Sequence, residues 1–305
     1  MRNSFISARN ASIGGGVAVA LLLTGCAGQT SPVASSKSTT AVQFKADPAL
    51  QSMLPKNIKS AGFVKVASDV PYPPFEFYDT DGKTIIGAEP DLARALGQVL
   101  GIEFRIEPVA FDNIIPGMSS GKYNVALSGM ADRKSRQSAV TFVDYMTNKP
   151  GFLVRVGGEF KPKSLTDLCG LKVAAQAATT VAADVTAQAT ACAAAGKKAP
   201  VLSQFQGQDK AILALRSKRV DVVDLTAGSA AYVIKQSGGD FELSGSYGGV
   251  MLGIAVAKDN PQLAEALKAA VQKLMDEGAY KSILTKWGLF QFNSADKAGI
   301  NGATT

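Results

Sequence analysis

Hydrophobic and polar positions alternate with period two in two segments, Val64 to Val66 and Glu103 to Glu107, which are therefore predicted to be strands. Between them, apolar residues recur every three or four positions from Leu92 to Leu100, a spacing typical of a helix. Pro90 suits the first turn of that helix, and Gly101 suits its C-terminal cap. The folded part of the chain is thus predicted to begin with a β-α-β unit.

Further apolar runs continue the alternation of strands and helices. A helix is expected to open at Asn260-Pro261 and to stop at Gly278, and residues 279–287 predict a short further helix. This order favours an α/β fold with mostly parallel sheets. The intervening strand candidates are Asn124–Leu127, Gly151–Val156, Leu171–Ala175 and Val220–Leu225.

The N-terminal segment has the pattern of an export signal. Arg2 and Arg9 precede an uncharged run, Ala11 to Leu23, whose apolar part is shorter than the ~20 residues that cross a bilayer. The run ends in Leu-Thr-Gly-Cys at residues 23–26, which resembles the lipobox of bacterial lipoproteins. That resemblance implies a signal peptide over residues 1–25 and a lipid on Cys26; an ordinary secretory signal cleaved nearby is the alternative.

Residues 27–40 are rich in Gly, Ser, Thr, Pro and Ala and are expected to form a flexible tether, which leads into the folded part by residue 59. Export places the protein in an oxidising environment, where the two remaining cysteines, Cys169 and Cys192, are predicted to pair. Such a bond would stabilise the fold by about 3 kcal/mol in the chain-entropy model. Two buried free thiols are the alternative.

Composition excludes several classes of function. The 305 residues are 46% hydrophobic and 19% charged, which suits a globular protein, and they include no histidine. Catalysis by Ser-His-Asp or Cys-His and metal sites that need imidazole are therefore absent, and we expect no cofactor. Without Arg2 and Arg9 the net charge falls from +7 to +5 and is spread along the chain, so no nucleic-acid partner is expected.

One ordered set of motifs resembles a known family. Residues 69–77, Asp-Val-Pro-Tyr-Pro-Pro-Phe-Glu-Phe, are similar to the first ligand loop of the bacterial extracellular solute-binding proteins of family 3, which serve ABC importers of polar amino acids. The resemblance covers about residues 60–290. The motifs that come after it in order are Gly87–Leu92, Ile114–Asn124, Ser128–Arg136, Val173–Thr180, Gln206–Asp209, Val220–Val223 and Lys286–Gly288.

The resemblance implies a periplasmic-binding-protein-like fold of type II, in which two α/β lobes joined by a two-strand hinge close around a ligand. Carried over, lobe 1 is residues 60–152 plus 250–290 and lobe 2 is 153–249. Residues 291–305 lose the hydrophobic pattern and are expected to be a disordered tail.

The resemblance also implies ligand-binding roles for side chains of both lobes. Arg136 matches the position that grips the ligand carboxylate, because a guanidinium fork fits a carboxylate; a surface arginine is the alternative. Asp69 matches an acidic ligand position, with a loop-capping role as the alternative. The other expected ligand residues are Tyr72 and Phe75 as an aromatic wall, Ser128, Gly129 and Met130 after a strand, Arg133, and Gln176, Thr179 and Thr180 at a strand-to-helix turn. Helix capping by Thr179 or Thr180 is compatible with ligand binding.

The chain departs from the family where the ligand's ammonium is held. Thr226 occupies the position of the usual aspartate, and Asp224, two residues earlier, would share its face on a strand. Ala131 replaces a common serine. A neutral Thr226 cannot balance a buried ammonium, so an amino-acid derivative is an alternative to a standard amino acid.

These features lead us to expect a lipid-anchored, extracytoplasmic and monomeric binding protein. It would capture an amino acid or an amino-acid-like carboxylate and deliver it to the membrane subunits of an ABC permease. A ligand-sensing receptor is one alternative. An enzyme resembling cyclohexadienyl dehydratase is another, for which Asp69, Glu76, Glu89 or Lys134 would have to supply the acid or base.

Overall fold

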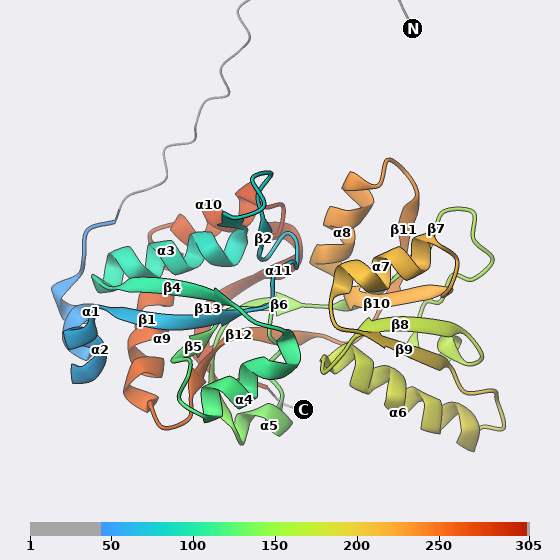
Figure 1. Cartoon of the computed structure of the whole chain (residues 1–305), viewed down its shortest axis with the longest axis horizontal. Coiled ribbons are helices and arrows are strands. Elements are labelled where there is room, and N and C mark those ends of the chain that lie inside the picture. The colour runs from blue at the N-terminus through green and yellow to red at the C-terminus, as the bar shows by residue number, and fades with distance from the viewer. Residues whose placement is uncertain (1–43, 304–305) are drawn as a thin grey trace, which may run out of the picture. The chain divides into compact units, whose positions relative to one another are not determined.

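The computed structural model describes residues 44–303, which form two α/β lobes (Figure 1). The predicted signal peptide, Cys26 and the tether up to residue 40 lie outside the described residues. Within the described part, no helix combines the length and the apolar character that crossing a membrane requires.

Lobe 1 is built on a six-stranded sheet in the order β13-β6-β12-β5-β1-β4. β1 runs parallel to β4 and β5, whereas the β5–β12, β12–β6 and β6–β13 ladders are antiparallel. The predicted β-α-β unit is confirmed as β1, α3 and β4. The strands are β1 (Phe63–Ser68), β4 (Glu103–Pro108), β5 (Val125–Ala126), β6 (Val140–Asn148), β12 (Val250–Ala257) and β13 (Ser294–Ile300).

Lobe 2 is built on a five-stranded sheet in the order β11-β7-β10-β8-β9. β8 runs parallel to β9 and β10, and β7 runs antiparallel to β10 and β11. The strands are β7 (Pro150–Arg155), β8 (Lys172–Gln176), β9 (Val201–Phe205), β10 (Val222–Thr226) and β11 (Phe241–Ser246); β2 (Phe77–Tyr78) and β3 (Ile85–Ile86) form a separate small hairpin near α3 of lobe 1.

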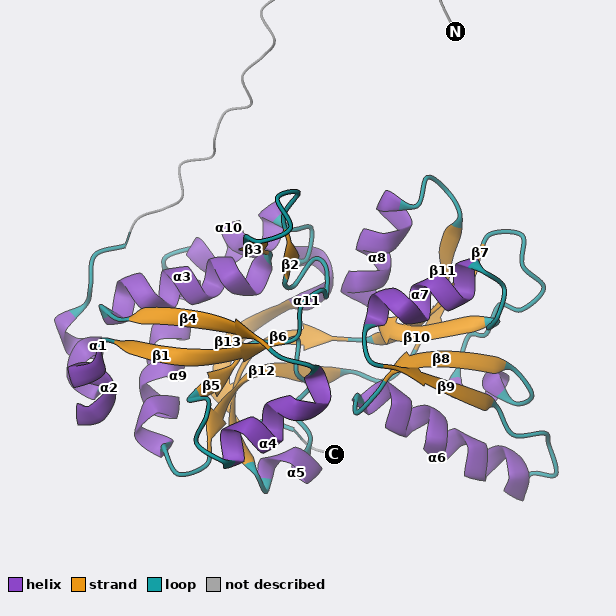
Figure 2. Ribbon diagram, viewed as in Figure 1, coloured by secondary structure: helices purple, strands orange, loops and turns teal. Residues whose placement is uncertain are grey.

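Helices cover the sheets of both lobes (Figure 2). The expected helix after Asn260 is α9, and the Asn260 side chain caps it by accepting a hydrogen bond from the Leu263 N–H. Lobe 1 carries α1 (Pro48–Met53), α2 (Lys56–Ala61), α3 (Ala88–Leu100), η1 (Phe111–Asn113), α4 (Ile114–Ser119), α5 (Lys134–Gln137), α9 (Pro261–Asp276), α10 (Ala279–Lys286) and α11 (Phe290–Asn293); lobe 2 carries η2 (Leu165–Leu168), α6 (Thr180–Ala194), α7 (Gln208–Arg216) and α8 (Ala227–Gln236).

The sheets are mixed rather than mostly parallel, which corrects the sequence prediction. The chain leaves lobe 1 through β6, passes Lys149 and enters lobe 2 as β7; it returns from β11 through residues 247–249 into β12. In each lobe the strand that enters from the other lobe lies beside the strand that leaves for it, and the two run in opposite directions, so the β6–β12 and β7–β11 ladders are antiparallel. The first crossing lies at Lys149, so residues 150–152 belong to the sheet of lobe 2 and not to lobe 1.

Both ends of the described chain are more ordered than the sequence indicated. Leu50, Leu54 and Ile58 of the lead-in are buried in the core of lobe 1, and the short helices α1 and α2 carry two of them. At the other end, the disordered tail expected from residue 291 is wrong for residues 291–303, because β13 pairs with the edge of β6. β13 is held by backbone hydrogen bonds to β6 and has no alternating apolar face. The hydrophobic pattern of the sequence therefore did not predict this strand.

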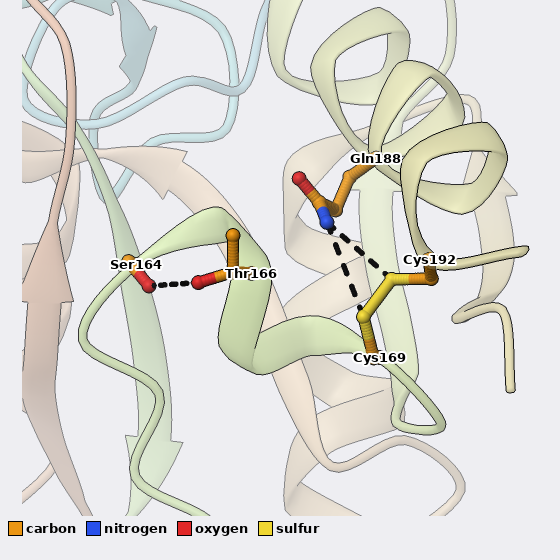
Figure 3. The surroundings of a disulfide bond; sticks show 5 residues. All are labelled: Ser164, Thr166, Cys169, Gln188 and Cys192. Atoms are coloured by element: carbon orange, nitrogen blue, oxygen red, sulfur yellow. Dashed lines mark hydrogen bonds between the residues drawn. A yellow bond between two sulfur atoms is a disulfide. The ribbon is translucent and has the colours of Figure 1, made fainter. Parts of the chain in front are cut away.

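The predicted disulfide is confirmed. Cys169, directly after η2, bonds to Cys192 near the end of α6, with 5.7 Å between their Cα atoms. Gln188, one turn earlier on α6, places its Nε2 3.4 Å from the Cys192 sulfur (Figure 3). Both cysteines lie in lobe 2, so the bond links two parts of one lobe and does not restrain the movement of one lobe against the other.

Candidate functional site

A cavity of about 50 Å³ lies where the two lobes meet. It is reached by the loops that come after β1 and β5 in lobe 1 and β8 and β10 in lobe 2, in line with the tendency of open α/β sheets to bind ligands at the carboxyl ends of their strands. The lining residues are Asp69, Tyr72, Phe111, Ser128, Gly129, Ala131, Asn148 and Leu252 from lobe 1, and Gln176, Thr179, Thr180, Val181, Gln208, Asp224, Leu225 and Thr226 from lobe 2.

The wall from lobe 1 is held by hydrogen bonds behind it. The Ser128 hydroxyl accepts a 2.9 Å hydrogen bond from the Asp69 N–H and donates one of 2.9 Å to the buried carboxyl group of Glu76. Gly129 has a φ of +51°, and a Cβ at this position would approach the Tyr72 ring to 2.5 Å. Position 129 therefore requires glycine, both for the backbone conformation and for the packing of Tyr72.

The wall from lobe 2 includes the first residues of two helices. Thr179 caps α6, because its Oγ1 accepts from the Ala182 N–H, and Thr226 caps α8 in the same way through the Ser229 N–H. The positive ends of both helix dipoles therefore face the cavity. The two roles expected of Thr179, capping and lining, apply together.

Asp224 is 1% exposed and shares the cavity-facing side of β10 with Thr226, as the strand geometry predicted. Its Oδ2 accepts a 2.8 Å hydrogen bond from the Tyr247 hydroxyl, whereas its Oδ1 has no partner among the described residues. Burial raises the pKa of Asp224 well above its usual value. A carboxyl group in this state would be stabilised by a cation in the cavity.

Asp69 is the second carboxyl group in the cavity wall. Burial raises its pKa to about 6, an effect that the hydrogen bond from Gln176 opposes and that Asp112 and Asp209 reinforce. No Lys or Arg lines the cavity among residues 44–303. The cavity thus combines two carboxyl groups with two helix N-termini, an arrangement that favours a ligand carrying both cationic and anionic groups.

Direct hydrogen bonds join the lobes around this cavity. The Tyr72 hydroxyl donates to the Thr226 hydroxyl at 2.8 Å, and the Gln176 amide donates to Asp69. At the rim, Arg133 forms a 3.2 Å ion pair with Asp184. These contacts cross from one lobe to the other, so the structure represents the closed arrangement.

Arg136 lies at the lobe interface and not in bulk solvent. From α5 it donates to the Ala131 carbonyl at 3.0 Å and, across the interface, to the Ala178 carbonyl at 2.9 Å. Its guanidinium carbon is 5.4 Å from the centre of the Phe111 ring, which lines the cavity. Burial, together with the charge of Arg133, lowers the pKa of Arg136 to about 10, which leaves it cationic at neutral pH.

Comparison with known proteins assigns the family. The model of the bacterial extracellular solute-binding proteins, family 3, matches residues 64–290. The chain belongs to this family. Arginine-binding protein ArgT of Corynebacterium glutamicum is 33% identical to this solute-binding protein over 257 residues, which cover 83% of each chain.

Solved structures share the fold of this solute-binding protein. An ancestral arginine-binding protein bound to arginine is 32% identical with a TM-score of 0.68 and covers 74% of this chain and 98% of its own. An ancestral amino-acid-binding protein described as a precursor of cyclohexadienyl dehydratase is 28% identical with a TM-score of 0.69, covering 76% and 97%. The type II fold with two lobes, expected from the motifs, is confirmed.

The structure brings nine of the thirteen expected ligand residues to the cavity, and it places four elsewhere. Phe75 is a correction: it is fully buried and stacks beneath Tyr72, with ring centres 5.0 Å apart, so it supports the wall rather than forming it. Met130 is another, because its side chain is buried in the core and its carbonyl accepts from the Gly253 N–H. Arg133 and Arg136 lie beside the cavity, at the lobe interface.

Several lining residues of the solute-binding protein were missed. Phe111 begins η1, and Asn148 ends β6. No pattern of the sequence marks either of them as a lining residue. Gln208 begins α7 and belongs to one of the motifs of the family resemblance. Its position at a helix N-terminus could therefore have indicated that it lines the cavity.

Proposed function

We propose that this protein captures a cationic amino acid of the arginine type for an ABC importer. The observation that carries the proposal is a pair of carboxyl groups, the half-buried Asp69 and the buried Asp224, in a cavity wall with no basic side chain among the described residues. Buried carboxylates are costly unless they are paired, and a ligand with two cationic groups would pair both. The arginine-binding proteins among the relatives support the same ligand class.

Asp224 is proposed to hold the α-ammonium in place of the aspartate that Thr226 replaces. Asp224 lines the cavity beside Thr226, and its Oδ1 has no hydrogen-bond partner within residues 44–303. Asp69, on the opposite lobe, is then left for the distal guanidinium or amine of the ligand. In this arrangement the N-terminus of α6 and the nearby Arg136 receive the ligand carboxylate.

Binding requires the lobes to open first, because hydrogen bonds join them directly around the cavity. On opening, the bonds between Tyr72 and Thr226 and between Gln176 and Asp69 would break, since each joins the two lobes. A ligand that replaces these bonds stabilises the closed form by its higher affinity for it. Arg136 would exchange the Ala178 carbonyl for the ligand carboxylate.

Isothermal titration of the ligand-free protein tests the ligand class. Arginine is expected to bind, with lysine and ornithine weaker and glutamate silent, because Asp69 repels an acidic side chain. Amino-acid derivatives that keep a guanidinium group belong in the same series. Absence of heat with every cationic amino acid and derivative contradicts the proposal.

An importer subunit and a sensing receptor differ in the step after closure. Uptake of labelled arginine by cells that lack the gene distinguishes them: lost uptake supports transport, and unchanged uptake with an altered response supports sensing.

We also propose that a lipid on Cys26 anchors the protein at the extracytoplasmic face. Mass spectrometry of the mature N-terminus, with Cys26→Ser as the control, tests the anchor.

The dehydratase alternative is favoured by one structural relative, the ancestral precursor protein. Against it, Glu76 and Glu89 are buried behind Ser128 and Gly129 and do not line the cavity, which leaves Asp69 as the acid best placed among those considered. Incubation with arogenate or prephenate tests this reaction. A product peak that Asp69→Asn abolishes would support the enzyme.

A further inference from the structure

The chain continues beyond the family match, which ends at residue 290, and its last described residues contact the binding loop from behind. We name residues Asn301–Ala303 the C-terminal clasp. Asn301 continues the pairing along β6: its N–H donates to the Phe142 carbonyl at 3.1 Å, and its side-chain oxygen accepts from the Phe142 N–H at 2.8 Å. The clasp is thereby fixed to the strand that leads into lobe 2.

The next two N–H groups of the clasp reach two buried carboxyl groups. The Gly302 N–H donates to Oδ2 of Asp144 at 2.7 Å, and the Ala303 N–H donates to Oδ2 of Asp132 at 2.9 Å. Both aspartates are 1% exposed, and neither forms an ion pair within residues 44–303. Hydrogen bonds from backbone N–H groups therefore supply part of the stabilisation that these carboxyl groups lack from cations.

The space around Asp144 is matched to the clasp. A Cβ at Gly302 would come within 2.8 Å of Oδ2 of Asp144, and one at Gly253 within 3.1 Å of Oδ1. Gly299 lies on the same side, where a Cβ would be 3.5 Å from Oδ2. Glycine at positions 302 and 253 lets the backbone approach the carboxyl group closely, whereas the space at Gly299 would admit a Cβ.

Asp132 joins the clasp to the binding loop. It lies between Ala131, which lines the cavity and accepts from Arg136, and Arg133, which pairs with Asp184 of lobe 2. Its own N–H donates to the Met251 carbonyl on β12. The Gln137 side chain of α5 also donates to Oδ1 of Asp132 at 2.8 Å. Five bonds thus converge on the loop around residue 132, and the one from Ala303 comes from outside the matched family segment.

We propose that the C-terminal clasp is a positioning element for ligand binding: by holding Asp132, it fixes the loop that presents Ala131, Arg133 and Arg136 to the cleft. The affinity consequence rests on the proposed function, whereas the effect on the loop does not. Loss of the Ala303 donor would leave Oδ2 of Asp132 without this partner, while Gln137 still binds Oδ1, and the loop would be held less firmly. The residues of the clasp are not proposed to touch the ligand; they affect the binding loop through Asp132.

The test compares Ala303→Pro, which removes the N–H donor, with Ala303→Gly, which keeps it. Hydrogen exchange of the ligand-free proteins over residues 128–137 measures the loop directly, and titration with L-arginine measures affinity. Ala303→Pro is expected to accelerate exchange in this segment and to weaken arginine binding by about tenfold, the loss typical of one hydrogen bond to a charged group. Ala303→Gly is expected to stay within about twofold of the wild type, because its donor is intact.

The outcomes separate the clasp from the ligand proposal. Unchanged hydrogen exchange in Ala303→Pro overturns the clasp proposal, whatever the wild type binds. If the wild type binds arginine, faster exchange in Ala303→Pro with unchanged arginine affinity also overturns it. If the wild type does not bind arginine, accelerated exchange still supports the clasp, and the ligand proposal alone fails. If Ala303→Pro does not fold, Asp132→Asn, which retains one acceptor oxygen, replaces it. This variant is expected to show the same changes to a smaller degree, and unchanged hydrogen exchange in it overturns the clasp proposal.

Discussion

The Tyr72 hydroxyl of lobe 1 donates a 2.8 Å hydrogen bond to the Thr226 hydroxyl of lobe 2, across the cavity where the ligand is proposed to bind. Tyr72→Phe removes this bond and keeps the stacking on Phe75. A neutral hydrogen bond contributes about 1 kcal/mol, so the closed ligand-free form should lose about fivefold in population relative to the open form. Stopped-flow measurements should show faster arginine association.

The exposed Tyr78 offers a matched control, because Tyr78→Phe changes the same group away from the cleft. Equal association rates for the wild type and both variants would argue that the Tyr72–Thr226 bond does not limit opening.

Asp224→Asn tests the carboxyl group that faces the cavity. The amide is neutral, so the ammonium loses its charged partner and arginine affinity should fall roughly tenfold to a hundredfold, in line with about 1.5–3 kcal/mol for a hydrogen bond to a charged group. The ligand-free protein should be as stable as the wild type or more so, because burial penalises the charged form of Asp224. Titration and thermal unfolding measure the two effects. Asp240→Asn, on the surface, is the control.

Arginine affinity is expected to rise with pH between about 4 and 6. In the closed ligand-free form the pKa of Asp69 is raised to about 6, and a bound cation would lower it, so binding releases a proton in this range. For the ligand-free protein the sign is opposite: a raised pKa contributes stability below about pH 4 that is lost as the pH rises through about 6. Titrations from acidic to neutral pH check both directions. Asp69→Asn should remove the part of this rise that Asp69 contributes and leave the part that the buried Asp224 contributes, and a profile that falls with pH would rule out this role.

Ala178 occupies a left-handed conformation, with φ of +61°. Alanine is strained in this region and glycine is not, although glycine also loses more chain entropy on folding. Ala178→Gly is therefore expected to stabilise the protein by up to about 1 kcal/mol, and Ala178→Val to destabilise it, as measured by chemical denaturation. A clear loss of stability in Ala178→Gly would show that the strain is compensated elsewhere.

Much of the fold was predictable because local patterns encode it. The period-two and helical spacings located β1, α3, β4 and α9, and export chemistry indicated the disulfide. The antiparallel ladders and β13 were not predictable in this way, because they depend on where the chain crosses between lobes and on backbone pairing that leaves no apolar pattern.

The candidate site likewise contains residues that local patterns predict and residues that only long-range packing brings to the cavity. Asp224 and Thr226 were placed on one face because strand geometry fixes it, and both line the cavity. Phe75 and Tyr72 belong to the same short motif, and only the packing of one ring on the other decides which of them faces the cavity. Asn148 and Leu252 meet there through the two crossings, a relationship between residues far apart in the chain that no local pattern expresses.

Lobe 2 is one uninterrupted stretch, whereas lobe 1 is assembled from the two flanking stretches. During synthesis from the N-terminal end, the inner stretch can therefore reach its full set of partners while the outer sheet still lacks β12 and β13. The order of emergence thus favours completion of the inserted lobe before the lobe that carries both ends of the described chain. It also means that the inserted lobe, with its own disulfide, can be excised as a single continuous fragment.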